Sequence, residues 1–258
     1  MSLAGRHVVI TGATGGLGSA FARAFAEAGA HVGLGYFGPV TAAEALAGEL
    51  QALKVRAVPL AADVTSPDEV RSMFERADAE LGPIDVLVNN AGLDGKRAPA
   101  WEIALEDWRA PLEVNLFGAF ACAREALRRM VPRKAGVIVN VSSVHDVVPW
   151  GGHSAYAASK AGLAMLTKTL ALEAAEFGVR VLAVAPGAIR TPINEDVWAT
   201  AEGRRDLQRK IAMGRVGEPA EVADLVVSLA GDAGGYVTGT TVYIDGGLCL
   251  YPEFRHGG

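Results

Sequence analysis

Short apolar runs of strand length alternate with longer amphipathic stretches along the chain. The runs predict strands over residues 8–10, 32–36, 55–61, 84–88, 137–141, 179–184 and 241–244. Most of these runs are continuously apolar rather than alternating, which is typical of parallel strands that are buried on both faces. We therefore expect helices to cover both sides of one sheet.

The stretches between the strands have apolar residues at helical spacing. Ser66 is a suitable N-cap with Pro67 at the first helical position, and Gly29 is a suitable C-terminal cap. Pro111 and Gly118 make kinks possible in one long helix. The predicted helices cover residues 17–28, 41–53, 67–81, 105–131, 153–177 and 219–229, with a shorter piece at 203–212.

This alternation predicts an α/β fold: a single-domain Rossmann fold over residues 1–258, with a doubly wound parallel sheet of about seven strands. In such a sheet the ligand lies beyond the carboxyl ends of the strands. Five polar or glycine-rich segments begin at these ends, at Gly12, Asp63, Asn89, Ser143 and Pro186. We expect them to converge on one rim of the sheet and to form the ligand site.

Composition and charge narrow the partners and the compartment. The chain has 258 residues, of which 50% are hydrophobic, and a net charge of −5 without a long basic run. Phosphate contacts need clustered Lys and Arg, so we expect no nucleic-acid partner. Two cysteines, Cys122 and Cys249, make no disulfide framework. Residues 1–7 have no apolar leader and no apolar run reaches the ~20 residues of a membrane span, so we expect a cytoplasmic protein without membrane contact.

The turn at residues 11–18 reads Thr-Gly-x-x-x-Gly-x-Gly between a predicted strand and a predicted helix. Gly12, Gly16 and Gly18 allow a tight turn and a close approach of the backbone to a pyrophosphate. The helix that follows offers free N–H groups and a partial positive charge. This context predicts dinucleotide binding.

Tyr156 and Lys160 are four residues apart on a predicted helix and share one face. A free tyrosine has a pKa of about 10, and a nearby ammonium is expected to lower it. The pair could then remove a proton from an alcohol or return one to a ketone. Taken alone, the same spacing also fits an ordinary solvated helix face.

The motifs together resemble the short-chain dehydrogenase/reductase family, and they occur in the family's order over nearly the whole chain. They are the glycine turn, Asn89-Asn90-Ala91-Gly92, Asn115, Ser143, Tyr156-x-x-x-Lys160, and Pro186-Gly187 through Thr191. The resemblance implies an oxidoreductase that uses NAD or NADP, with residues 188–217 as a substrate lid. It also implies that four residues are catalytic: Asn115, Ser143, Tyr156 and Lys160.

Each catalytic role follows from the resemblance. Tyr156 is the proton donor or acceptor, and Lys160 holds the nicotinamide ribose and lowers the tyrosine pKa. Ser143 hydrogen-bonds the reacting oxygen, whereas its neighbour Ser142 faces away. Asn115 supports a proton-relay water or, alternatively, makes a hydrogen bond at a helix kink.

The resemblance likewise implies the cofactor contacts. Asp63 and Val64 are expected at the adenine and Thr191 at the nicotinamide amide. The full set is Gly12, Thr14, Gly15, Gly16, Leu17, Gly18, Tyr36, Asp63, Val64, Asn90, Ala91, Gly92, Tyr156, Lys160, Pro186, Gly187, Ile189 and Thr191.

Cofactor choice depends on the end of the second strand. Residues 35–38 have neither the acid typical of NAD-specific members nor a cation for the 2′-phosphate of NADP. Because a phosphate without a cation is poorly compensated, NAD is slightly favoured. Arg56 is a possible source of a cation from elsewhere in the chain.

A narrower resemblance concerns residues 142–146, 149–150, 186–194 and the tail at 251–254, which are similar to bacterial glucose 1-dehydrogenases. It implies oxidation of the anomeric hydroxyl of glucose or a similar sugar to the lactone, and a homotetramer. Phe37 replaces that subgroup's basic residue. Two alternatives stay open: reduction of a 3-oxoacyl thioester or small ketone, and a non-catalytic cofactor-sensing protein.

Several further residues flank the predicted site. His145 and His153 have no further ligands at metal-binding spacing, so we expect no metal site and place them in a polar pocket wall or on a loop surface. Asp94, Lys96 and Arg97 could contact a sugar hydroxyl or form a solvated loop. Trp150 could stack on a sugar or pack under the lid. The sequence therefore predicts a small-molecule site, with a sugar or ketone as substrate.

Overall fold

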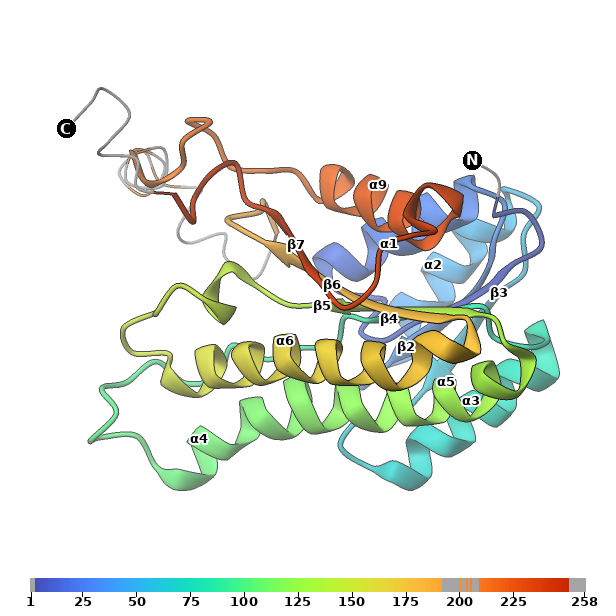
Figure 1. Ribbon diagram of the computed structural model, residues 1–258, viewed down its shortest axis with the longest axis horizontal. Helices are drawn as coiled ribbons and strands as arrows, with labels where there is room; N and C mark the ends of the chain where they lie inside the picture. Colours follow the sequence, from blue (N-terminus) through green and yellow to red (C-terminus); the bar gives the residue numbers. More distant parts are fainter. Residues whose placement is uncertain (1–2, 192–199, 201–202, 204, 206–208, 251–258) are drawn as a thin grey trace.

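A computed structural model describes residues 3–191, 200, 203, 205 and 209–250 of the chain. Seven parallel strands form one sheet in the order β3-β2-β1-β4-β5-β6-β7 (Figure 1). The strands are β1 His7–Ile10, β2 His31–Tyr36, β3 Ala57–Ala61, β4 Val86–Asn89, β5 Gly136–Val141, β6 Val179–Pro186 and β7 Thr241–Ile244. This confirms the predicted doubly wound sheet of a Rossmann-type domain.

Helices cover both faces of the sheet (Figure 1). One layer contains α1 Gly16–Glu27, α2 Thr41–Gln51 and α9 Pro219–Ala230; the other contains α3 Pro67–Leu81, α4 Leu105–Leu112, α5 Ala119–Arg133 and α6 Ser154–Ala174. Successive strand residues point to opposite faces. Val8 and Ile10 therefore pack in the first core, while Val9 packs in the second.

The predicted helix ends have the expected chemistry. Ser66 Oγ accepts a hydrogen bond from the backbone N–H of Glu69 at 3.4 Å, and Pro67 begins α3. Gly29 follows the C-cap of α1 with a φ of +88°, a conformation that glycine adopts without strain. These local choices fix where the helices meet the strands.

The long helix predicted over residues 105–131 is interrupted. A π-helix, η1 Glu113–Gly118, separates α4 from α5. A side chain at position 118 would collide with Val64, since a Cβ on Gly118 would lie 2.7 Å from Val64 Cγ2. The prediction of kinks at Pro111 and Gly118 located the irregular region, although it missed the wider turn. Such turns are frequent at functional sites.

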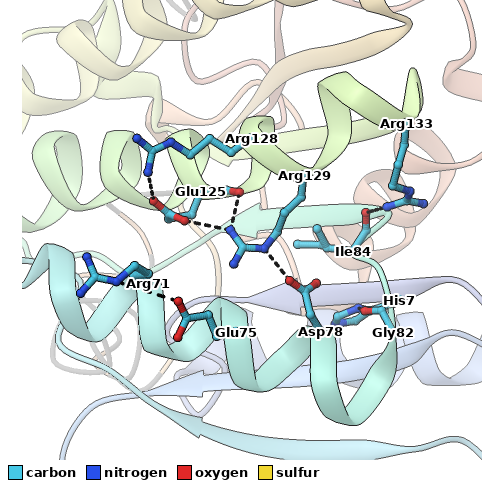
Figure 2. Close-up of polar contacts among 10 residues, drawn as sticks. All are labelled: His7, Arg71, Glu75, Asp78, Gly82, Ile84, Glu125, Arg128, Arg129 and Arg133. Atoms are coloured by element: carbon cyan, nitrogen blue, oxygen red, sulfur yellow. Dashed lines mark hydrogen bonds and ion pairs between the residues drawn. The ribbon is translucent and has the colours of Figure 1, made fainter.

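An ionic cluster joins α3 to α5, on the opposite side of the sheet from α1 (Figure 2). Arg129 donates to Asp78 Oδ2 at 2.6 Å and to Glu125 Oε2 at 2.8 Å. The Glu125 side chain is only 8% exposed and also accepts from Arg128 at 2.9 Å. The bond from Arg129 to Asp78 links α5 to α3. Removing either side chain would leave its partly buried partner with an uncompensated charge, which is destabilising.

His7 is buried at the start of β1, beside the end of α3 (Figure 2). Its Nδ1 lies 2.6 Å from Gly82 O, and its Nε2 is buried without a partner among the described residues. Burial lowers the pKa of His7, while Gly82, Asp78 and Asp85 oppose the shift. The imidazole is therefore neutral in the folded protein, with Nδ1–H donating to Gly82 O.

We expect His7 to make stability fall in mild acid. A histidine with a lowered pKa in the folded state takes up a proton more readily in the unfolded state. It therefore leaves the free energy of unfolding unchanged above its unfolded pKa of about 6.5, and it lowers that free energy as pH drops below this value. His7→Gln keeps a donor for Gly82 and does not titrate. Urea unfolding at pH 7.5 and 5.5 should show a smaller acid loss in the variant than in wild type. Parallel losses in the two proteins would contradict this assignment.

Candidate active site

The rim centres on the point where strand order reverses, between β1 and β4. Thr11 Oγ1 accepts the backbone N–H groups of Asn90 and Ala91, each at 3.0 Å. In return, Asn90 Nδ2 donates to Thr11 O and Gly12 O, again at 3.0 Å. Four hydrogen bonds thus fasten the loop after β4 to the glycine turn. In parallel sheets the ligand crevice lies at this switch point.

The glycine turn has a shape that only glycine permits. Gly12 has a φ of +62°, and a Cβ on Gly18 would lie 2.1 Å from Gly12 O. Gly15 is the N-cap of α1 and makes no side-chain capping bond. The first N–H groups of α1 are thus left for an anion, so this turn fits the pyrophosphate of a dinucleotide. Thr14, Gly16 and Leu17 complete the same turn.

Further along the rim, β2 and β3 end at Tyr36 and Ala61. Asp63 Oδ1 accepts from the N–H and hydroxyl of Thr65, at 2.9 and 2.7 Å, which shapes the turn before α3. Segments 12–18, 36–41 and 61–66 contain no Lys or Arg. The side of the rim expected to hold the adenosine therefore has no cation of its own.

Arg56 does not reach this part of the rim. It precedes β3, at the amino end of the strand, and donates to Glu80 O at 2.7 Å and Leu81 O at 2.9 Å. These carbonyls belong to the last turn of α3, where a cation complements the helix dipole. The idea that Arg56 could supply the missing cation is therefore wrong.

The catalytic group predicted from the sequence comes together between β5 and α6. Lys160 is buried, and its Nζ donates to Val141 O, the last residue of β5, at 2.9 Å. The same Nζ lies 5.6 Å from the centre of the Tyr156 ring. Ser143, two residues beyond β5, is buried, and its side chain acts to lower the pKa of Tyr156. A Cβ on Gly92 would lie 3.8 Å from Lys160 Nζ, so the loop after β4 closes the group.

The protein alone does not lower the pKa of Tyr156, contrary to the expectation from its spacing with Lys160. Burial raises the pKa of Tyr156 to about 12, a shift that the hydrogen bond with Ser143 opposes and that Asp94 and Asp146 reinforce. Burial likewise lowers the pKa of Lys160 to about 8, against the effect of the same carboxylates. Desolvation of both groups outweighs their mutual attraction here.

Asn115 lies in the π-helix η1 and is buried. Its Oδ1 accepts Leu93 N–H at 2.7 Å, while Nδ2 donates to Leu93 O and Ser159 Oγ, both at 2.9 Å. Ser159 Oγ in turn donates to Tyr156 O at 2.7 Å. The hydrogen-bonding alternative for Asn115 is therefore confirmed, and its link to a proton-relay water stays a prediction.

Asn89, Asn140 and Thr167 form a buried ladder of polar side chains that was not predicted from the sequence. Asn89 Nδ2 donates to Asn140 Oδ1 at 2.9 Å, and Asn140 Nδ2 donates to Thr167 Oγ1 at 2.8 Å. It joins β4 and β5 to α6 below Lys160. The one available signal was Asn140 itself, a polar residue inside the apolar run at 137–141. Its partners, Asn89 and Thr167, lie 51 and 27 residues away.

Aromatic rings form a wall beside Tyr156. Trp150 stacks between His145 and His153, with ring centres 4.4 and 3.8 Å apart. Its ring centre lies 5.7 Å from that of Tyr156, edge to face. The two histidines therefore belong to the site wall, as expected. Trp150 packs on them, an arrangement that the sequence alternatives did not include.

The remaining predicted contacts follow β6 or lie beside the wall. Gly187 N–H donates to Ile244 O at 3.0 Å, and Ile189 and Thr191 are buried. Lys96 pairs with Asp107 at 3.1 Å instead of facing the site. Part of the predicted lid at 188–217, part of the helical piece at 203–212, and the tail at 251–254 lie outside the described residues. Asn115, Ser143, Tyr156 and Lys160 thus share one rim with the predicted cofactor contacts in the described ranges.

The described ranges contain neither a membrane span nor a metal site. None of the helices there combines the length and apolarity needed to cross a bilayer. Within the same residues, no three His, Cys, Asp or Glu side chains gather in a way that could hold a metal ion.

Comparisons with known proteins agree with this geometry. Residues 12–249 match the family described as enoyl-(acyl carrier protein) reductase. The chain is 44% identical over 256 residues to 3beta-hydroxysteroid dehydrogenase 1 of Eggerthella lenta, covering 99% of this chain and 98% of that protein. It is 36% identical over 252 residues to glucose 1-dehydrogenase 2 of Bacillus subtilis, covering 97% of each.

A solved structure has the same fold as this chain. The gluconate 5-dehydrogenase from Burkholderia cenocepacia, in complex with NADP and tartrate, has a TM-score of 0.91 at 34% identity, over 97% of both chains. The fold and the rim are those of a dinucleotide-dependent oxidoreductase. The chain belongs to the short-chain dehydrogenase/reductase family.

Proposed function

We propose that this protein catalyses reversible hydride transfer between NAD(P) and a secondary alcohol on a ring, with Tyr156 as the proton-transfer residue. The observation that carries the proposal is the convergence of Ser143, Tyr156 and Lys160 at the switch-point rim. In the oxidation direction, Tyr156 as phenolate takes the hydroxyl proton. Ser143 orients the oxygen, and Lys160 in its charged form favours the phenolate. The complete set argues against a non-catalytic cofactor sensor.

The dinucleotide would be held by residues whose surroundings suit it. Gly12 and Gly18 let the turn pack tightly on itself and against residues 90–91, which brings the start of α1, where the pyrophosphate would bind, to the rim. Asp63, Val64 and the 90–92 loop line the adenosine side, and residues 186–191 the nicotinamide side. When bound, nicotinamide supplies the hydride acceptor. A 3-oxoacyl or small-ketone reductase would use the same residues in the reverse direction.

Tyr156→Phe is the direct test of this mechanism. The variant lacks the hydroxyl that moves the proton but keeps the ring packed against Trp150. We expect turnover to fall by at least ~10²-fold, the scale of general acid–base loss. NAD(P) affinity, measured by fluorescence titration, should change little. Near-normal turnover of the folded variant would falsify the mechanism.

Two substrate classes are supported by different parts of the site wall. The Asp94 carboxylate acts on His145, Tyr156 and Lys160, which suits a hydroxyl-rich sugar such as glucose at its anomeric carbon. The aromatic stack, together with exposed Leu93 and Val147, suits a flat apolar ring such as a hydroxysteroid. Initial rates at 340 nm with glucose, a 3β-hydroxysteroid and cyclohexanols separate the two. Loss of activity in Asp94→Asn only on sugars would support the sugar.

Cofactor selectivity can be tested at Phe37, which is 77% exposed just after the end of β2. Since no cation lies in the surrounding segments, we propose a preference for NAD. Phe37→Arg would place a guanidinium beside the 2′-phosphate. A charge-assisted hydrogen bond contributes about 1.5–3 kcal/mol, so kcat/KM for NADP should rise roughly ten- to a hundredfold, with a much smaller change for NAD.

The control for this substitution is Leu53→Arg, which adds the same charge two residues beyond the C-terminal end of α2 and should leave selectivity unchanged. Both cofactors are compared at fixed ionic strength. A strong wild-type preference for NADP, or no gain in Phe37→Arg, would mean that Phe37 is not at the 2′ position.

We also propose that the protein is a homotetramer, as its family resemblance implies, in the cytoplasm. Phe117 and Phe120 are each 41% exposed, and they line an apolar hollow with Leu112, Leu116 and Leu166. Exposed apolar patches of this kind mark interfaces. Light scattering should give four chains for wild type and fewer for Phe117→Asp, whereas Leu53→Asp should not dissociate. A monomeric wild type at micromolar concentration would rule out the tetramer.

A further inference from the structure

Asp146 joins the turn that carries Ser143 to the edge strand of the sheet. It ends the short 3-10 helix η2 Val144–Asp146, and its N–H donates to Ser143 O at 2.9 Å. Its two carboxylate oxygens have different partners. Ser142 Oγ donates to Oδ2 at 2.9 Å, and Tyr243 OH donates to Oδ1 at 2.7 Å. One side chain therefore links residues after β5 with a residue of β7.

The partner on β7 is well fixed. Tyr243 pairs with Ala185 in the parallel ladder between β6 and β7, which holds its backbone. Burial and then the bond to Asp146 raise the pKa of Tyr243, so that its hydroxyl keeps the proton that it donates. A 2.7 Å bond to a carboxylate is in the range of charge-assisted hydrogen bonds. Tyr243 is 39% exposed, and its bond ties Asp146 to β7.

The turn itself determines the direction of the Ser143 hydroxyl. Ser143 has extended backbone angles, and its Oγ accepts the N–H of His145 at 3.2 Å. With this acceptor position used, the hydroxyl proton can be donated elsewhere. A shift of residues 143–146 would move both the hydroxyl and its orienting bond. The Asp146 side chain accepts from Ser142, which precedes this turn, and from Tyr243 on β7, and so controls the position of the turn.

We propose that Asp146 is a positioning residue: clipped to Tyr243, it holds the Ser143 turn in the orientation that Ser143 needs beside Tyr156. The proposal rests on the role given to Ser143 in the proposed function. It assigns Asp146 no contact with substrate. It also explains why a carboxylate, with two acceptor oxygens, stands between two hydroxyl donors.

The charge of Asp146 gives a second, separable signal. Its carboxylate raises the pKa of both Tyr156 and Lys160, as does Asp94. Removing the charge should therefore move the pH profile of turnover to lower pH, while removing Tyr243 should not. The other titratable groups that act on this region are His145, His153, Asp245 and Cys249.

Three substitutions separate the clip from the charge. Asp146→Ala removes both. Asp146→Asn removes the charge but can keep both contacts, because its oxygen accepts from Tyr243 and its NH₂ donates to Ser142, whose hydroxyl can rotate. Tyr243→Phe removes one contact and keeps the charge. Glu44→Ala, which deletes an exposed carboxylate on α2, is the matched control.

The experiment measures kcat, KM and the pH profile of the cofactor-loaded protein with its best substrate. We expect kcat to fall about tenfold in Asp146→Ala and severalfold in Tyr243→Phe, the scale of one hydrogen bond to a charged group. KM for the cofactor should not change. The double variant Asp146→Ala/Tyr243→Phe should have the same kcat as Asp146→Ala alone, because both substitutions remove the same hydrogen bond. Asp146→Asn should recover most of kcat with its profile shifted to lower pH.

Wild-type kcat in Asp146→Ala would overturn the proposal, and so would equal losses in Asp146→Ala and Asp146→Asn. A crystal structure of Asp146→Ala gives a test that needs no turnover, since the Ser143 turn should be displaced, and an unmoved turn refutes the clip. Tyr156→Phe run in parallel keeps the two hypotheses apart. Full activity there defeats the proposed function, whereas an inactive Tyr156→Phe with an unaffected Asp146→Ala defeats the clip alone.

Discussion

The buried amine of Lys160 is the constraint on which the rim depends. A charged ammonium removed from water is costly unless other groups compensate it. The carbonyl of Val141 accepts from Nζ at 2.9 Å, and the carboxylates of Asp94 and Asp146 favour the charged form. The end of β5, the loop after β4 and the first turns of α6 must therefore keep fixed distances. The Asn115 bonds to Leu93 and Ser159 hold these same elements together.

This constraint explains why polar side chains are found so deep in an apolar sheet. Asn89, Asn140 and Thr167 form a ladder directly below the rim, where each amide or hydroxyl must find a partner. Asn89 Oδ1 is buried without a partner among the described residues, whereas the bonds that the ladder does make allow one register between neighbouring elements. The strands supply the shape, and the ladder fixes α6 along them. Because Tyr156 and Lys160 lie on α6, the position of α6 along the strands determines where these two side chains lie.

The fold could be predicted from the sequence because its signals are local. Continuous apolar runs gave the strands to within a few residues, and Ser66, Pro67 and Gly29 marked helix ends through chemistry confined to one turn. The rim also followed, since parallel strands bring their carboxyl ends to one edge. Helical spacing pointed to Tyr156 and Lys160, the family resemblance added Ser143 and the catalytic roles, and the structure brings the three residues together. The π-helix at 113–118, the role of Arg56 and the partners of Asn140 depend on contacts between distant segments, for which no local pattern exists.

The pKa of Tyr156 shows the same limit and has a mechanistic consequence. Spacing on a helix predicted attraction between Tyr156 and Lys160, but the balance with desolvation depends on burial that only the fold determines. With pKa values of about 12 and about 8, both groups are neutral between these limits. The form needed in the proposed mechanism, phenolate beside ammonium, has the same net charge and differs by one proton moved between them. Acceptors placed at Nζ, or a positive charge near the phenol, favour that form. On this proposal, a positive charge that binds beside Tyr156 lowers the pKa of its phenol and favours the phenolate.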